Sequence, residues 1–174
     1  MNSRAAIDYN TPFDIMTGFW AGVATTYDPK GNYLGSRSSR LAVYWKKPHT
    51  VIHFCQEMDL SDEMLEGYAP GKAPDRFIRL DLDLQVNGKY ARGSTGGSNA
   101  MEVTGTATRP DHYHFHLQSK QGHWYNNHHF MGPDERHILG PFIGRNGEIA
   151  AVVAQTFKRM SHDVPTEFMR TPRH

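Results

Sequence analysis

Histidines are concentrated in one stretch of this 174-residue chain. Six of its 11 histidines lie between residues 111 and 130, in the sequence DHYHFHLQSKQGHWYNNHHF. Imidazole is the side chain that gains or loses a proton near neutral pH, and it is also a common ligand of transition metals. The stretch therefore predicts proton-transfer chemistry or a metal site, and the direction in which the histidines point decides between them.

The spacing within this stretch predicts a β-hairpin with two unlike faces. Residues 112–117 alternate histidine with Tyr, Phe or Leu, and a period of two is that of a β-strand. After a turn, residues 123–130 return as the partner strand, with Tyr113 opposite His128. One face of the hairpin is then imidazole, phenol and amide, and the other is mostly aromatic.

The length of the preceding loop decides which face lines the interior. If the loop is Thr108–Asp111, the imidazoles share the side of Ala107 and point inward. If it is Arg109–Asp111, Tyr113 takes that side instead. Burying a large apolar side chain stabilises a fold by ~1.5–3 kcal/mol, which favours the aromatic face inside.

With the aromatic face inward, we predict acid–base chemistry in an interior cavity. The predicted catalytic groups are His128, His53 and Tyr113, since a histidine beside a phenol can move a proton to or from a bound molecule. We expect Arg40 to bind a carboxylate or a developing enolate. The other predicted substrate contacts are Tyr44, Phe115, Trp124, Asn126 and Phe130.

With the imidazole face inward, the same hairpin predicts a metal site. Its ligands would be His112, His114 and His129, since imidazoles that converge from neighbouring positions bind zinc or iron. Three successive positions on one face of a strand span roughly 13 Å, so one ion contacts at most two of them together with His129. For the favoured orientation we predict no metal and no cofactor.

Composition excludes several classes of protein. The 19 basic and 18 acidic residues balance, so no charge pattern for a nucleic acid or membrane partner is present. The single cysteine, Cys55, rules out an intrachain disulfide and a multi-cysteine zinc site. No long apolar run or signal-peptide pattern occurs, so we expect a cytoplasmic protein. A homodimer is left open.

The order of elements predicts an all-β fold. Eight or nine short strands in hairpin sequence favour a single antiparallel up-and-down β-barrel, which leaves no sheet edge. One short helix is expected over Asp59–Tyr68, and residues 131–147 are expected to form a loop with several turns. We interpret the chain 1–174 as one domain, with 1–12 as a lead-in and 161–174 as an extended tail.

Two positions carry a resemblance to a known superfamily. Gly18-Phe19-Trp20 opens the first long strand and Arg159 lies near the end of the last, an arrangement that resembles the calycins, and in particular the bacterial intracellular lipocalin-like barrels. The resemblance implies that Trp20 closes the barrel floor and that Arg159 packs across it. Proteins of this kind include carriers, haem binders, isomerases and lyases.

These observations lead to one expected function and three alternatives. We expect a cofactor-independent isomerase, cyclase or lyase that acts on a small, largely apolar or aromatic molecule in the barrel lumen. The alternatives are a non-catalytic carrier, a haem-binding barrel that uses His128 or His162, and a His-ligated metalloprotein.

Overall fold

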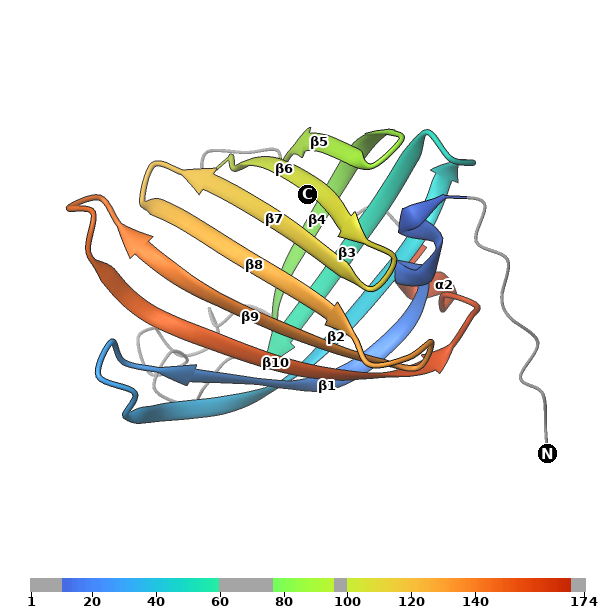
Figure 1. Ribbon diagram of the computed structural model, residues 1–174. Helices are drawn as coiled ribbons and strands as arrows, with labels where there is room; N and C mark the ends of the chain where they lie inside the picture. The colour runs from blue at the N-terminus through green and yellow to red at the C-terminus, as the bar shows by residue number, and fades with distance from the viewer. Residues whose placement is uncertain (1–10, 60–76, 96–99, 170–174) are drawn as a thin grey trace, which may run out of the picture.

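Ten antiparallel strands close into a barrel. The computed structural model describes residues 11–59, 77–95 and 100–169. Each strand pairs with its neighbours in the chain, and the first pairs with the last (Figure 1). The strands are β1 Gly18–Tyr27, β2 Tyr33–Lys47, β3 Val51–Asp59, β4 Phe77–Asn87, β5 Tyr90–Ser94, β6 Glu102–Arg109, β7 His112–Ser119, β8 Gly122–Phe130, β9 Glu135–Gly144 and β10 Ile149–Ser161. The all-β antiparallel barrel is thus confirmed, with ten strands rather than eight or nine.

The additional strand is β9, which occupies most of the segment 131–147 that was predicted as a loop. Gly140 and Pro141 in this segment are residue types that usually mark turns. Gly140 serves a different purpose, because a Cβ at this position would lie 2.3 Å from the backbone oxygen of Tyr125 on β8. The glycine allows two strands to approach closely, so the loop prediction was wrong.

The register of the β7–β8 hairpin follows the predicted pairing. Tyr113 lies opposite His128, and Tyr113 is also the partner of Ala107 on β6. Because cross-strand partners share a face, the aromatic residues point inward. Tyr113 and Phe115 are 0% and 5% exposed. The imidazoles of His112, His114 and His116 therefore lie outside the barrel.

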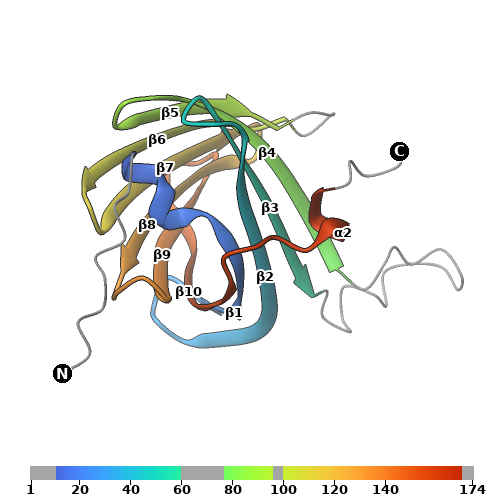
Figure 2. The ribbon, with the colours of Figure 1, turned by 90° about the vertical axis from the view of Figure 1, so that its right-hand side faces the viewer.

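Trp20 and Arg159 close one end of the barrel, as the resemblance implied. The 3-10 helix η1, Pro12–Met16, crosses this end (Figure 2), and the indole nitrogen of Trp20 donates to the Met16 carbonyl at 2.9 Å. The Arg159 guanidinium carbon lies 4.1 Å from the centre of a Trp20 ring. The floor is therefore built around a cation–π contact between β1 and β10.

Gly18 has a geometric reason to precede Trp20 by two positions. Its φ of 120° is rarely adopted by residues with a side chain. A Cβ there would also lie 2.8 Å from Nη1 of Arg159. The glycine in Gly-x-Trp thus leaves room for the arginine that packs on the tryptophan.

The C-terminal segment packs against the outside of the barrel instead of extending into solvent. Helix α2, Thr166–Met169, places Phe168 on Ala42 of β2 and Cys55 of β3. Phe168 is 1% exposed and Cys55 is 0% exposed. This contact corrects the prediction of an extended tail. The helix expected over Asp59–Tyr68 falls outside the described residues, apart from Asp59 at the end of β3.

Within the three described ranges, no helix has both the length and the apolar character needed to cross a membrane.

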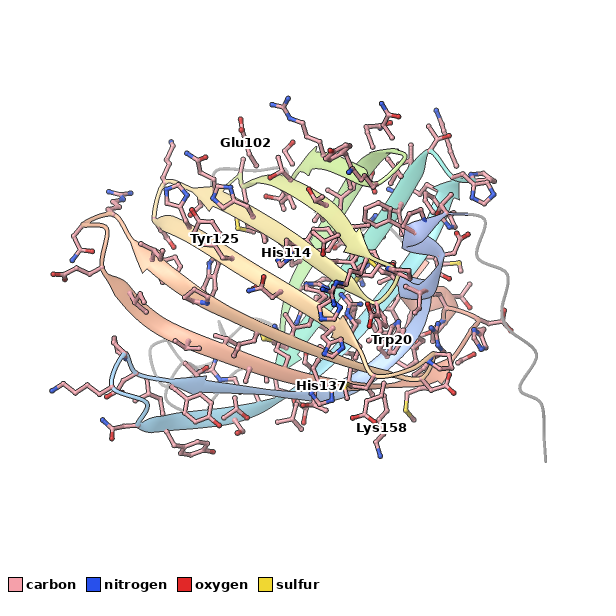
Figure 3. All side chains as sticks on the ribbon, viewed as in Figure 1. Trp20, Glu102, His114, Tyr125, His137 and Lys158 are labelled. Carbon is pink, nitrogen blue, oxygen red and sulfur yellow. The ribbon has the colours of Figure 1, made fainter. Side chains whose placement is uncertain are left out.

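Replacing Arg159 with Met should destabilise the fold by several kcal/mol, because each buried carbonyl left without its donor costs roughly 1–3 kcal/mol. Arg159 donates hydrogen bonds to the backbone carbonyls of Ile15, Thr17 and Pro133, and the variant leaves all three without that donor. The neighbouring Lys158 points away from the barrel (Figure 3), so Lys158→Met should change stability by about 0.5 kcal/mol or less. Urea unfolding of both variants tests the difference, and equal stabilities would contradict it.

Candidate functional site

The interior of the barrel contains a cavity of about 60 Å³. Most of its wall is apolar, and five polar side chains interrupt it on strands β3, β8, β9 and β10. The apolar lining is Leu41, Phe54, Leu80, Leu82, Leu84, Val103, Phe115, Leu117 and Ile138, and the polar lining is Gln56, Asn126, His128, Arg136 and Gln155. A largely apolar cavity with a few polar groups is the usual form of a small-molecule site.

Arg136 is the most unusual residue of this lining. It lies on β9 and is 1% exposed, with its guanidinium carbon 5.4 Å from the centre of the Phe130 ring and 6.0 Å from Trp20. Nη2 of Arg136 lies 2.5 Å from Nδ1 of His128. Nε and Nη1 have no hydrogen-bond partner among the described residues. A buried polar group without a partner costs roughly 1–3 kcal/mol, and more when charged, so this arrangement needs an explanation.

The charge of Arg136 is maintained despite its burial. Burial lowers the pKa of Arg136 to about 9, and the positive charge of Arg159 acts in the same direction. A group with this pKa remains protonated at neutral pH. The cavity therefore has a cation at one end, and its one hydrogen-bond partner among the described residues is His128 rather than a carboxylate.

His128 is neutral in this environment. Burial, followed by the positive charge of Arg136, holds the pKa of His128 well below its usual range. An arginine nitrogen can only donate a hydrogen bond, so Nδ1 of His128 is the acceptor. The neutral ring then has its hydrogen on Nε2, and at that atom it can donate a hydrogen bond but cannot accept one.

Several residues predicted for the site lie inside the barrel. Phe115, Asn126 and His128 line the cavity. Tyr113 and Phe130 are buried at the floor, where Tyr113 donates to the Pro110 carbonyl at 3.1 Å and the two rings contact each other edge to face. Trp124 stacks on Phe142 and packs on the core cluster without lining the cavity. Their roles toward a ligand stay predictions.

The expectation that His53, Tyr44 and Arg40 join the lumen is wrong. Phe54 and Leu41 line the cavity, and successive residues of a strand point to opposite faces, so His53 and Arg40 point outward. Tyr44 is the cross-strand partner of His53 and shares its face.

These three residues belong to an ion-pair network on the outer face. His53 Nδ1 lies 2.5 Å from Oδ1 of Asp83, and the His53 ring packs on Tyr44 at 4.9 Å. Arg40 Nη2 lies 2.7 Å from Oε2 of Glu57. The sequence pattern could not place His53, because residues 51–55 are buried whichever way they point.

Sequence reasoning missed Arg136, Gln56 and Gln155. Arg136 was hidden because its strand had been taken for a loop. The available signal was the alternation of Arg136 and Ile138 with His137 and Leu139, which predicts a strand but places a charge on its inner face. Gln56 and Gln155 bond to each other at 2.8 Å across the lumen, a pairing that only the closed barrel reveals.

No family model and no curated protein matches the sequence. Solved structures do resemble the fold. The S-type phycobiliprotein lyase CPES from Guillardia theta aligns over 88% of this chain and 91% of its own, with 12% identity and a TM-score of 0.61. A protein with unknown function from the DUF3598 family of Nostoc punctiforme aligns over 85% of this chain and 49% of its own, with 12% identity and a TM-score of 0.62. Rv2717c from M. tuberculosis aligns over 88% and 99%, with 11% identity and a TM-score of 0.60. The likeness shows the fold alone.

The buried neutral state of His128 predicts a specific loss of stability in mild acid. An unfolded histidine takes up a proton near pH 6.5, whereas folded His128 resists protonation, so the unfolded state binds more protons as the pH falls. We expect the free energy of unfolding to decrease between about pH 6.5 and pH 4.5, by up to ~1.4 kcal/mol per unit. This window lies above the usual aspartate pKa of about 4.

The variant His128→Gln should flatten the profile in this window, and His114→Gln, on the outer face, should leave it unchanged. Urea unfolding at a series of pH values measures both. A parent profile that is already flat over the window would contradict the assignment.

Proposed function

We propose that the protein binds an apolar organic molecule bearing one carboxylate, with the carboxylate on Arg136. The observation that supports this is the buried guanidinium with unmatched donors at Nε and Nη1. Nη2 carries two hydrogens and gives one to His128. Its second hydrogen lies beside either Nε–H or Nη1–H, so one edge of the guanidinium has two parallel donors for a carboxylate.

The rest of the cavity suits the apolar part of such a molecule. Phe54, Phe115 and several leucines form the wall, and the amide of Asn126 adds a polar contact. The volume of about 60 Å³ is smaller than the engineered cavity of ~150 Å³ that binds benzene. A slender carboxylate-bearing chain therefore fits at Arg136 better than a ring, and a porphyrin macrocycle would require the strands to move apart.

Catalysis by His128 is the second candidate, and the hydrogen on Nε2 gives it a definite form. Because Nδ1 accepts from Arg136, His128 is better suited to donate a hydrogen bond to a ligand carbonyl than to act as the general base. Polarising a carbonyl in this way serves isomerase, cyclase or lyase chemistry. A carrier needs only the binding function, so the variant His128→Gln separates the two: it keeps binding and loses turnover of any substrate found.

Butyric acid and its methyl ester, short enough for a cavity of about 60 Å³, test the proposed carboxylate site by isothermal titration calorimetry. A hydrogen bond to a charged group is worth roughly 1.5–3 kcal/mol, so we expect the acid to bind about 10–150-fold more tightly than the ester. Arg136→Met should remove this preference, and Arg92→Met, an exposed change on β5, should keep it. Equal binding of acid and ester to the parent would overturn the proposal.

When neither protein has a ligand, the same Arg136→Met variant should be more stable than the parent. Replacing buried charged groups with apolar residues of similar volume has stabilised proteins by about 1–4 kcal/mol. We expect a higher melting temperature together with lost acid binding, the combination typical of a residue kept for function. Thermal unfolding measures it, and a less stable variant would indicate a structural role for Arg136.

A further inference from the structure

Outside the barrel, the imidazole face of the β7–β8 hairpin gathers three metal-binding side chains at one end. Asp111 lies in the turn between β6 and β7, His112 begins β7, and His129 is its cross-strand partner on β8. One ligand atom from each of the three lies within 4.8 Å of the others.

The carboxylate of Asp111 faces both imidazoles. Its Oδ1 lies 2.8 Å from Nδ1 of His112, and its Oδ2 lies 3.8 Å from Nε2 of His129. The two rings are stacked, with centroids 4.1 Å apart and planes at 24°. An ordinary surface ion pair would need only one of the two histidines.

The distances suit ligands that turn inward onto one ion. Two nitrogen or oxygen ligands of a tetrahedral ion with bonds of 2.0–2.1 Å lie roughly 3.3 Å apart. The side chains of Asp111, His112 and His129 are 49%, 34% and 42% exposed, so the stacked rings have room to rotate and direct their ligand atoms at one ion. The same exposure lets water complete the coordination.

We propose that Asp111, His112 and His129 bind a divalent transition-metal ion. Two imidazoles and one carboxylate are a donor set that suits Zn²⁺, Fe²⁺ and related ions, with further positions left for water or a substrate. This outer site does not depend on the lumen or on Arg136.

His114 does not belong to this set, which corrects the ligands expected from the sequence. It lies one row further along β7, at roughly 6.6 Å of strand rise from His112, and its Nδ1 contacts the side-chain oxygen of Asn127. Figure 3 shows His114 on the outside of the barrel, and the cross-strand partner of His129 on β9 is His137. The turn residue Asp111 supplies the oxygen ligand in place of His114.

Bound metal would join the β6–β7 turn to β8. A ligand that binds only the folded state raises the unfolding temperature with its concentration. Zn²⁺ binding and stability should therefore change together, and both should depend on the same three side chains.

Competition of the full-length protein with a chromophoric chelator for Zn²⁺ tests the proposal. We expect one ion per chain in the parent. Asp111→Asn and His129→Ala should weaken binding by at least the ~10–100-fold that loss of even an outer partner of a metal ligand causes. Both should also abolish the Zn²⁺-dependent rise in unfolding temperature, with far-UV circular dichroism unchanged.

Two matched controls use other histidines of the outer face, His114 and His123. His114→Ala should keep the ion. His123→Ala should keep it too, although the ring nitrogens of His123 and His116 lie 2.9 Å apart and this pair of imidazoles could compete for the ion. Loss of the ion in His123→Ala with retention in His129→Ala would move the site to that pair and overturn the proposal. Equal, weak binding by all variants would show adsorption to scattered histidines and would also overturn it.

Discussion

The closed end of the barrel depends on how Arg159 is held against Trp20. That guanidinium bonds to carbonyls from the segment before β1 and from the β8–β9 turn, and lies on the indole, so its donors and its charge are satisfied. Arg136 lies near the same indole but, within the described part of the chain, forms a hydrogen bond to His128 alone. The two arginines differ in what surrounds them: the donors of Arg159 are matched by backbone carbonyls, whereas Nε and Nη1 of Arg136 have no partner among the described residues. Because Arg159 also helps to lower the pKa of Arg136, the floor and the cavity are electrostatically coupled.

Strand alternation separates two kinds of chemistry within one hairpin. His128 and His129 are neighbours in sequence, yet one is buried beside an arginine and the other is partly exposed beside an aspartate. A slip of one residue in register would exchange their environments and expose the inward aromatic side chains of the hairpin to solvent. The burial of Tyr113, Phe115 and Phe130 therefore fixes the register, and with it the position of every histidine in the hairpin.

The sequence predicts those parts of the structure that depend on burial and on a period of two. The inward aromatic row is of this kind, whereas the contact of Trp20 with Arg159 was expected only from the resemblance to the calycins. Arg136 could not be predicted in the same way, because a buried charge opposes the burial rule and because Gly140 and Pro141 resemble turn residues. His53 was misplaced for another reason: residues 51–55 are buried on both faces, so hydrophobicity does not distinguish inside from outside there. Arg40 is exposed, and its position next to the buried Leu41 could have placed it outside.

The packing of α2 over Cys55 has a consequence for how the protein can be observed. Burial raises the pKa of this thiol to about 12, so almost none of it is the reactive thiolate at neutral pH. The same thiol is covered by Phe168 on the outside of the barrel, away from the cavity. A thiol-alkylating reagent can therefore reach Cys55 only in molecules in which α2 has separated from the barrel or the barrel has opened. Because Cys55 is the chain's single cysteine, its rate of alkylation, followed by mass spectrometry, reports the rate of that opening without any engineered label.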